Sequence, residues 1–230
     1  MKFSFIIPTL NEETYLGECL KSIKNQTVQD YEIIIVDSHS KDRTVKIAKK
    51  YGAKVLYEGR KGPGVARNTG AKKAKGEILI FPDADVRFEK NFLEILEKKM
   101  KTVTAGSIFN IVPYDAQNKT LKVNYKIANF IARLFVSLGI PLTAGSCFAY
   151  RKEFFDRVKG FNPEFMTNED HDLAERISKF GRFEYFSDIT VWTSTRRVRR
   201  WGTLKSTKIY AKSTFAFFLN RSYIRDYWTN

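Results

Sequence analysis

The first hundred residues alternate between short apolar runs and longer segments whose apolar residues recur at helical spacing. The runs that predict strands are Lys2–Pro8, Tyr31–Asp37, Ala53–Tyr57 and Glu77–Phe81. The segments that predict helices are Glu13–Asn25, Asp42–Tyr51, Gly64–Ala74 and Phe88–Met100. Strands that are apolar along their whole length and are separated by helices are typical of a parallel sheet covered on both faces. The pattern therefore predicts an α/β fold.

This alternation stops at about residue 102, and a different pattern follows. Here we expect strands at Thr104–Val112 and Gly145–Tyr150, and two short strands within Arg182–Trp192. The expected helices are Thr120–Leu138, Arg151–Val158 and Asp170–Phe180. The first of these helices carries a stripe of apolar residues at helical spacing, namely Ile127, Phe130, Ile131, Leu134, Phe135 and Leu138. Its basic residues Lys122, Lys126 and Arg133 lie off that stripe.

Polar or acidic residues follow three of the four strands predicted in the first hundred residues. The stretches are Thr9–Glu13 after the first strand, Asp37–Asp42 after the second and Pro82–Asp85 after the fourth. In open α/β sheets, ligands bind beyond the carboxyl ends of the strands. We therefore expect these three stretches to converge on one crevice, which is the candidate site.

The tripeptide Asp83-Ala84-Asp85 offers the clearest chemistry in this crevice. Mg²⁺ and Mn²⁺ take oxygen ligands, and Mg²⁺ is usually held by one or two carboxylates together with substrate phosphates. A bound cation would neutralise a diphosphate leaving group. In isolation the tripeptide could equally be a polar turn that ends a strand. Its position directly after the apolar run Glu77–Phe81 favours a metal and phosphate site.

Asp37 and Arg67 each allow two interpretations. Asp37 could cap a turn, or its carboxylate could accept hydrogen bonds from a nucleotide base or sugar. Arg67 could be a surface charge on a helix, or its planar guanidinium could bind a phosphate or a base carbonyl. The glycines around Arg67 form neither a GxGxxG fingerprint nor a P-loop. Their arrangement argues against a dehydrogenase and against a P-loop kinase.

The acidic cluster Glu169-Asp170-His171-Asp172 opens a predicted helix. Acids in a first helical turn are common because they oppose the helix dipole. The alternative is that one of them acts as a general base and removes the proton of an acceptor hydroxyl. His171 could be a metal ligand, but a lone histidine is more often structural.

The net charge of +15 and the pI of about 9.7 favour anionic partners such as nucleotides, phospholipid headgroups or nucleic acid. The two cysteines, Cys19 and Cys147, lie far apart, which predicts reduced thiols in a cytoplasmic protein. The first apolar run is too short for a signal peptide. The longest uncharged stretch, Leu134–Tyr150, is interrupted by Gly139 and Pro141, so we expect no membrane span.

Taken together, these stretches resemble the family 2 glycosyltransferases of GT-A fold across residues 3–200. The matching segments are FSFIIPTLNEE, EIIIVDSHSKDRT, GPGVARNTGAKKAKGEILIFPDAD, GSCFAYRKEFFDRVKGFNPEF and NEDHDLAERISKFG, which begin at Phe3, Glu32, Gly62, Gly145 and Asn168. The resemblance implies a Rossmann-like, mostly parallel sheet flanked by helices. It divides the chain into a glycosyltransferase domain at 1–195, with a donor half at 1–112 and an acceptor half at 113–195. A basic, aromatic extension follows at 196–230.

The resemblance also implies a role for each matched residue. Thr9, Asn11 and Glu12 would border the nucleotide, together with Asp37, Arg67 and Ala84. Asp83 would contact ribose or phosphate and assist the metal, Asp85 would bind Mg²⁺ or Mn²⁺, and Asp170, with Glu169 beside it, would be the catalytic base. Gly145 and Ser146 would shape the acceptor side. The implied reaction moves a sugar from a UDP- or GDP-sugar to a hydroxyl acceptor, with inversion.

Two segments depart from the pattern of the family. Asp37-Ser38-His39-Ser40 stands where many members have Asp-Asp-Gly-Ser. Processive members carry QxxRW, whereas this chain has Arg197-Val198-Arg199-Arg200-Trp201. The change puts processive synthesis in doubt and leaves Arg197 or Arg200 as a candidate for binding the diphosphate. Trp201 is a candidate for the acceptor side.

The extension has nine Lys and Arg residues and a single acid, Asp226, together with many aromatic residues. It could pack its aromatic side chains on the domain, or it could contact an anionic membrane surface as a peripheral protein, as could the helix Thr120–Leu138. A glycan or a lipid-linked acceptor is the expected partner. The alternative functions are a polyprenyl-phosphate sugar synthase and a basic protein that binds nucleotides or nucleic acid without catalysis. No nucleic-acid reading module is recognisable, so we expect no nucleic-acid partner.

Overall fold

The computed structural model describes residues 1–143, 145–202, 205–206 and 208–209. The strands are β1 Phe3–Thr9, β2 Tyr31–Asp37, β3 Lys54–Tyr57, β4 Ile78–Pro82, β5 Arg87–Phe88, β6 Thr104–Pro113, β7 Cys147–Arg151 and β8 Arg182–Thr193. The helices are α1 Leu16–Lys24, α2 Thr44–Lys50, α3 Pro63–Ala71, α4 Phe92–Lys99, α5 Lys119–Ser137, α6 Lys152–Arg157, α7 Glu169–Ser178 and α8 Arg196–Trp201. The aromatic residues of the extension from Tyr210 onward lie outside the described residues. Within the described part, no helix is both long and apolar enough to cross a membrane.

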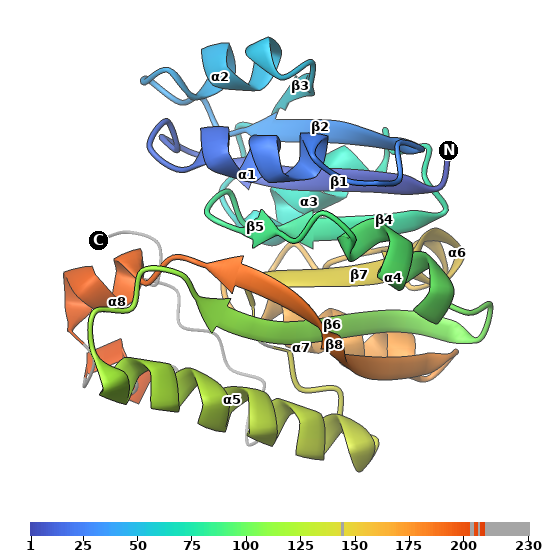
Figure 1. Cartoon of the computed structure of the whole chain (residues 1–230). Coiled ribbons are helices and arrows are strands. Elements are labelled where there is room, and N and C mark those ends of the chain that lie inside the picture. The colour runs from blue at the N-terminus through green and yellow to red at the C-terminus, as the bar shows by residue number, and fades with distance from the viewer. Residues whose placement is uncertain (144, 203–204, 207, 210–230) are drawn as a thin grey trace.

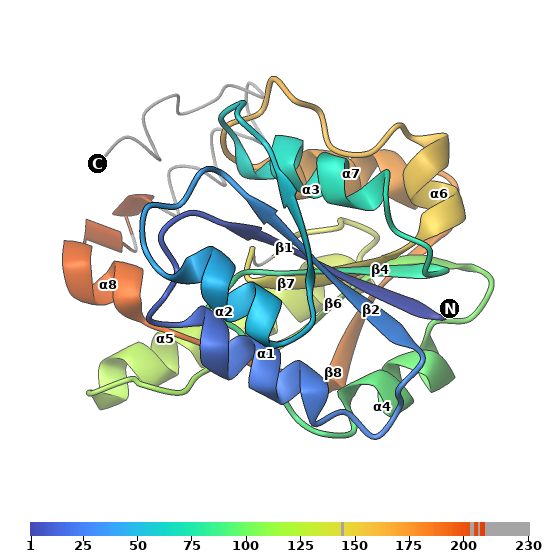
Figure 2. The same ribbon diagram turned by 90° about the horizontal axis from the view of Figure 1, so that it is seen from above.

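The strands form one mixed sheet in the order β3-β2-β1-β4-β7-β6-β8-β5 (Figure 1). Strands β1 to β4 pair in parallel, β7 runs antiparallel to both β4 and β6, and β6 is parallel to β8. Helices α3, α6 and α7 lie on one side of the sheet, whereas α1 and α4 lie on the other (Figure 2). The α/β fold predicted from the apolar pattern is confirmed, with an antiparallel β7 where the two halves of the chain meet.

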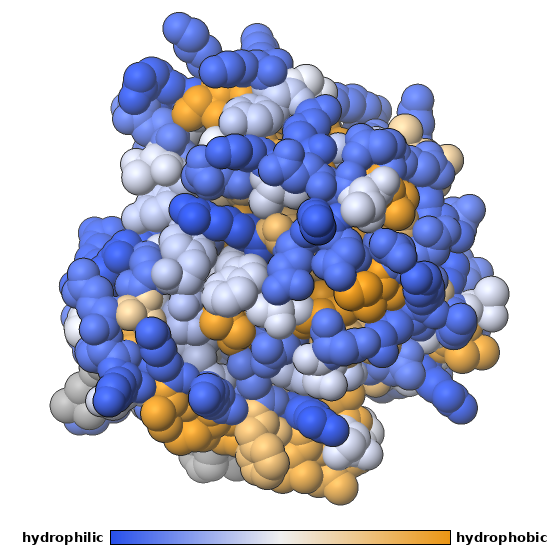
Figure 3. Space-filling view, in the orientation of Figure 1, coloured by the Kyte–Doolittle hydropathy of each residue, from blue (hydrophilic) through white to orange (hydrophobic). Residues whose placement is uncertain are grey.

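Helix α5 packs on β6 and β8, but most of its apolar stripe faces away from them, and of the residues in that stripe only Phe135 is half-buried. Only Leu121 and Ala132 of this helix are buried. The side chains of Ile127, Phe130 and Leu134 are exposed. In Figure 3 an apolar area lies along the lower edge of the molecule, where Figure 1 places α5. The outward-facing stripe is unusual, since such a stripe normally faces the core of its own domain.

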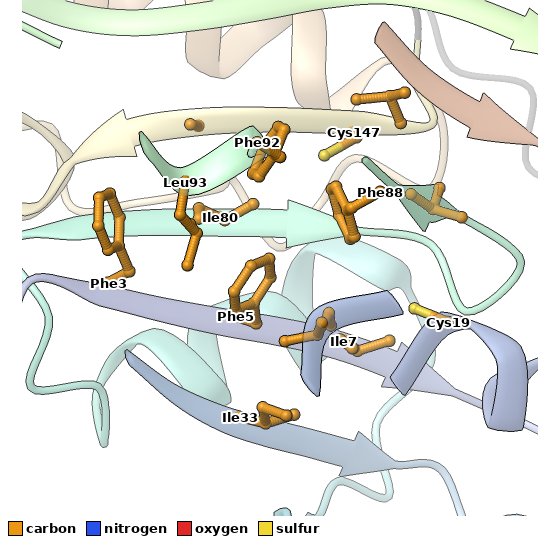
Figure 4. Packing of buried hydrophobic residues seen from close by; sticks show 14 of the residues in the cluster. Phe3, Phe5, Ile7, Cys19, Ile33, Ile80, Phe88, Phe92, Leu93 and Cys147 are labelled. Atoms are coloured by element: carbon orange, nitrogen blue, oxygen red, sulfur yellow. The ribbon is translucent and has the colours of Figure 1, made fainter. Parts of the chain in front are cut away.

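Strand β1 shows why the apolar strands form a buried layer. Its residues Phe3, Phe5 and Ile7 pack with Cys19 and Phe92 on one side of the sheet (Figure 4). Ile6 points to the other side and joins the cluster beneath α3 and α7. Because successive side chains of a strand alternate between faces, a strand covered on both faces is apolar at almost every position.

Two expectations from the sequence pattern need correction. Arg182–Thr193 is one strand rather than two short ones, because β8 stays paired with β6 across an irregularity at which Phe109 pairs with Phe186 and Asn110 with Thr190. The pattern also missed β5 and α8. A strand of two residues has no period, and α8 reads RRVRRW, which is almost entirely charged.

Candidate active site

The carboxyl ends of β1, β2 and β4 bring the three predicted polar stretches to one edge of the sheet. The parallel register of β1 and β2 pairs Thr9 with Asp37, and the Thr9 hydroxyl donates a hydrogen bond of 2.9 Å to Asp37 Oδ1. Ser40 donates its backbone N–H to Asp37 Oδ2 at 2.8 Å and its hydroxyl to Oδ1 at 2.6 Å. Asp37 is fully buried. Its charge is thus balanced by neutral donors, which also fix the loop after β2.

Asn11 and Glu12 bridge the first two loops. Asn11 adopts a left-handed backbone conformation with φ 55°, its N–H donates to Ser40 Oγ at 2.8 Å, and its side-chain oxygen accepts from Lys41 N at 2.9 Å. The N–H of Glu12 donates to Thr44 Oγ1 at 2.7 Å. The carboxylate of Glu12 points elsewhere and accepts from the guanidinium of Arg196, with Nη2 to Oε1 at 2.8 Å.

Arg67 joins the donor motif to the acidic cluster of α7. It is 3% exposed, and its Nη2 lies 3.0 Å from Asp83 Oδ1 while its Nη1 lies 2.6 Å from Glu169 Oε1. The guanidinium also lies 5.1 Å from the ring centre of Phe148. The interpretation of Arg67 as a surface charge is therefore wrong. A buried guanidinium between two carboxylates holds β4 and α7 in a fixed relation.

Asp85 and Arg196 form the second ion pair of the site. Asp85 is buried, and its Oδ2 lies 2.7 Å from Nε of Arg196, which also pairs with Glu12. Burial raises the pKa of the Asp85 carboxyl to about 7, the Arg196 guanidinium opposes this rise, and the carboxylates of Asp83 and Glu12 add to it. Arg196 therefore pairs with two acids, Glu12 and Asp85, while Asp83 pairs with Arg67. Ala84, between the two aspartates, packs into the core, so its side chain is directed away from the crevice.

The acids at the start of α7 separate into two groups. Asp172 pairs with Arg176 at 2.6 Å, whereas Glu169 and Asp170 are buried beside Arg67. Burial raises the pKa of Glu169 to about 7, the negative charge of Asp170 adds to the rise, and Arg67 opposes it. This close approach of α3 and α7 requires a small residue, because a Cβ at Gly64 would lie 3.3 Å from Glu169 Cγ.

His171 anchors the segment that precedes β7. Its Nδ1 accepts the backbone N–H of Thr143 at 3.0 Å, and burial lowers the pKa of the ring. An Nδ1 that accepts a hydrogen bond cannot carry a proton, so the ring is neutral and this nitrogen is not available to a metal. Gly145, two residues after Thr143, has φ 75°, a conformation that favours glycine. A Cβ at Gly145 would lie 3.8 Å from Asp170 Oδ2. The carbonyl of Ser146 accepts the N–H of Asp83 at 2.9 Å.

Sequence reasoning missed the role of Arg196. It selected Arg197 and Arg200 as candidates, but Arg196 is the residue that contacts Asp85 and Glu12. Arg200 is exposed, and Arg197 is close enough to Asp85 to act on its carboxyl electrostatically. Trp201 ends α8 and is half-buried. The run of arginines was the available signal, but no local pattern tells which of them turns toward the crevice.

The carboxylates fit a hard cation that keeps part of its coordination on a substrate. Among the described residues, no group of three or more His, Cys, Asp or Glu side chains is arranged to hold a metal on its own. Asp83 and Asp85 would nevertheless be able to supply the one or two carboxylates that Mg²⁺ typically takes from a protein when phosphates complete its shell. Burial is the main cause of the raised pKa of Asp85, and the carboxylates of Asp83 and Glu12 add to it, so a cation bound beside Asp85 would favour its charged form.

A protein-family model described as glycosyl transferase family 2 matches residues 4–159. The chain belongs to glycosyl transferase family 2. The prediction that it is a glycosyltransferase of GT-A fold is confirmed at the level of this family and fold. The segments Ser38-His39-Ser40 and Arg197–Trp201, which differ from the usual pattern of the family, are therefore variations within a member of that family.

Three known members of the family or its fold are similar to the chain. "Dolichyl N-acetyl-alpha-D-glucosaminyl phosphate 3-beta-D-2,3-diacetamido-2,3-dideoxy-beta-D-glucuronosyltransferase" of Methanococcus voltae is 29% identical over 93% of this chain and 71% of its own length. The structure of Staphylococcus aureus TarS 1–349 with UDP-GlcNAc has a TM-score of 0.68 and 24% identity, covering 85% of this chain and 59% of TarS 1–349. The mannosyltransferase PcManGT of Pyrobaculum calidifontis, solved with GDP-Man and Mn²⁺, has a TM-score of 0.69 and 21% identity, covering 92% of this chain and 64% of its own. By sequence, the match to TarS spans 18% of that protein.

Proposed function

We propose that this chain transfers a sugar from a nucleoside diphosphate-sugar to a hydroxyl group, with inversion at the anomeric carbon. The observation that carries the proposal is the buried bridge of Arg67 between Asp83 and Glu169, because it joins the predicted phosphate site to the predicted base. Transfer requires a donor and an acceptor oxygen held at a fixed separation. Support also comes from solved neighbours that bind UDP-GlcNAc or GDP-Man.

The donor would lie at the carboxyl ends of β1, β2 and β4. Asp85, with Asp83, would hold a divalent cation, which when bound neutralises charge on the departing diphosphate. Thr9, Asn11, Glu12 and Asp37 would border the nucleotide. The role of Arg67 in this proposal is to orient Asp83 and Glu169 rather than to touch the nucleotide, because its guanidinium is occupied by both carboxylates.

Asp170 would take the proton of the acceptor hydroxyl. Its Oδ1 accepts the N–H of His171 at 3.0 Å, and its Oδ2 faces Gly145 on the acceptor side. Glu169 is tied to Arg67 and would keep the pair in place. The same two acids favour a hydroxyl over a phosphate acceptor, because a phosphate would bring a second negative charge beside buried carboxyl groups.

The donor can be found with a thermal-shift panel of nucleotides and nucleotide-sugars, with and without Mn²⁺. A ligand that binds the folded state alone raises the melting temperature in proportion to RT ln(1 + [L]/Kd). We expect one nucleoside diphosphate and its sugars to raise it, and only when metal is present. If no nucleoside diphosphate changes the melting temperature with metal, the proposal is wrong.

With the donor known, Asp170→Asn separates binding from chemistry. The variant should bind donor like the wild type and lose about 10²–10⁴-fold in transfer rate, the usual contribution of a general base. Asp172→Asn is the matched control, because its carboxylate lies on the same helical turn but pairs with Arg176. Equal transfer rates for Asp170→Asn and the wild type would remove Asp170 from the mechanism.

A further inference from the structure

We propose that α5 is a docking helix that lies in the surface of an anionic lipid bilayer. Five apolar side chains of this helix and that of its C-cap residue Leu138 are exposed in one stripe, with exposed fractions from 40% to 67%. They are Val123, Ile127, Phe130, Ile131, Leu134 and Leu138. A continuous apolar face along one helix is typical of amphipathic helices that lie in the interface of a membrane.

The stripe is locked in its outward orientation. On the opposite side of α5, the side chain of Asn129 donates to the carbonyl of Ile111 at 2.7 Å and accepts the N–H of Ile111 at 3.0 Å. These two bonds pair the helix with β6, and the buried Ala132 packs one turn further along. Turning the stripe toward the sheet would break both bonds and leave the N–H and C=O groups of Ile111 without these partners. The exposed stripe is therefore a property of the folded domain.

The charge beside the stripe is uniformly positive. Lys119, Lys122, Lys126 and Arg133 are exposed, and the sequence has no Asp or Glu between Asp115 and Glu153. With about 100° of rotation per residue, these four positions fall along one flank of the stripe. Basic side chains at the edge of an apolar face are suited to phosphate headgroups, because their methylene chains can stay on the apolar side.

This charge pattern selects a bilayer over the other occupants of an apolar face. Two copies of the chain that paired through α5 would bring eight basic residues together without an acid from the helix. The chain's own segment 210–230 carries three basic residues and one acid, so it has the same sign of charge. An anionic bilayer is the partner that is both apolar in its interior and negative at its surface.

The position of α5 would turn the candidate site toward the membrane. The loop before α5 is tied to α8, because Asp115 accepts the N–H of Thr195 at 2.7 Å and pairs with Arg199 at 2.8 Å. Arg196, in the same helix, contacts Asp85. The start of α5 therefore lies at the active-site edge (Figure 1). If the proposed transfer is correct, a docked helix would favour acceptors anchored in lipid, but docking itself does not depend on transfer.

Flotation of the full chain with vesicles tests the proposal. We expect binding to phosphatidylcholine vesicles that contain phosphatidylserine at low salt, and much weaker binding to phosphatidylcholine alone or at high salt. The combined variant Ile127→Ser, Phe130→Ser, Leu134→Ser should bind at least about tenfold more weakly, because three side chains lose the apolar area that a bilayer buries. Tyr57→Ser is the matched control, since Tyr57 is an exposed apolar residue on β3, at the other end of the sheet.

Charge reversal gives a second, independent comparison. Lys122→Glu with Lys126→Glu should weaken binding by about fivefold per residue or more, as expected for basic groups at an anionic surface. Lys49→Glu with Lys50→Glu changes the net charge equally on the exposed part of α2 and should leave most of the binding intact. Equal losses for the two double variants would mean that net charge alone attracts the bilayer and would overturn the proposal.

Fluorescence places the helix relative to the lipid. In the presence of anionic vesicles, the Phe130→Trp variant should show an emission shift to shorter wavelength that Tyr57→Trp lacks. The proposal fails if wild-type protein does not bind vesicles or if the triple serine variant binds as well as wild type. It also fails if light scattering shows a dimer that the triple serine variant dissociates, because a second copy would then cover α5.

Discussion

Two acidic groups at the same sheet edge are stabilised in different ways. Asp37 is fully buried and its carboxylate is held by the hydroxyls of Thr9 and Ser40 and by a backbone N–H. Asp83, Asp85 and Glu169 are instead balanced by the guanidinium groups of Arg67 and Arg196. In the first group, neutral donors alone satisfy the hydrogen-bonding needs of the carboxylate. In the second group, the carboxylates are balanced by positive charges, and it is there that a metal and a diphosphate would bind.

Removing the Arg67 side chain from the second group should give the largest decrease in the free energy of unfolding. Arg67→Met would leave the buried Glu169 and the half-buried Asp83 without their partner, and breaking a buried ion pair in this way typically costs about 3–5 kcal/mol. The free energy of unfolding, measured with urea at pH 8, should fall by that amount. Arg60→Met is the control, because the Arg60 side chain is exposed although it also pairs with a glutamate. A loss below about 1 kcal/mol would contradict the structural role given to Arg67.

The pH dependence of stability should distinguish the two groups further. In the folded protein the pKa of Glu169 is raised from 4.5 to about 7, mainly by burial, so the folded state holds a proton that the unfolded chain releases between these values. The contribution of Glu169 to stability therefore decreases as the pH rises from about 4.5 to 7. Glu169→Gln removes this titration, and its unfolding free energy should vary less with pH than that of the wild type. Parallel pH profiles would contradict the raised pKa.

A smaller loss of unfolding free energy is expected when a hydrogen bond to Asp37, in the first group, is removed. Thr9→Val keeps the shape of the side chain but removes the hydroxyl that donates to Asp37. A hydrogen bond to a charged group contributes about 1.5–3 kcal/mol, and Ser40 remains to hold the carboxylate. Urea unfolding should show a loss in this range. A loss as large as that of Arg67→Met would mean that the two groups do not differ in the way described.

The smallest effect on stability is expected at Arg196, whose side chain is 23% exposed. At pH 6, Arg196→Gln should change the free energy of unfolding by less than about 1 kcal/mol, because solvent screens the partly exposed guanidinium. In addition, the buried Asp85, whose pKa is raised to about 7, can hold a proton when its partner is lost. It should nevertheless increase the affinity for Mn²⁺ alone, because the guanidinium occupies the carboxylates that a cation would use. Electron paramagnetic resonance of free Mn²⁺ can measure this. Unchanged or weaker Mn²⁺ binding would show that Arg196 does not compete with the metal.

The apolar pattern predicted much of this site because the physics that decides it is local. Runs without polar residues mark the strands, and parallel neighbours must end at one edge, so the contact between Thr9 and Asp37 follows from the register of β1 and β2. The crevice formed by the ends of β1, β2 and β4 was therefore predictable. The roles of Asp85 as metal ligand and Asp170 as base stay predictions.

Contacts between residues that lie far apart in the sequence could not be predicted in the same way. Arg196 is separated from Glu12 by 184 positions, and nothing local distinguishes it from the other three arginines of α8. The stripe on α5 predicted a helix, but a periodic pattern does not tell which face meets the domain. In this chain that choice depends on Asn129, whose bonds to Ile111 become visible only in the fold.

Calorimetric titration of the nucleoside diphosphate found in the panel tests the central claim most directly. The measurement compares wild type with Asp85→Asn, in Mn²⁺ and in chelator, with Asp30→Asn as an exposed control. We predict metal-dependent binding to wild type and to Asp30→Asn. Binding to Asp85→Asn should be weaker by more than about 100-fold, since even outer-shell changes cost metal sites 10–100-fold. Equal, metal-dependent binding by Asp85→Asn and wild type would contradict the account.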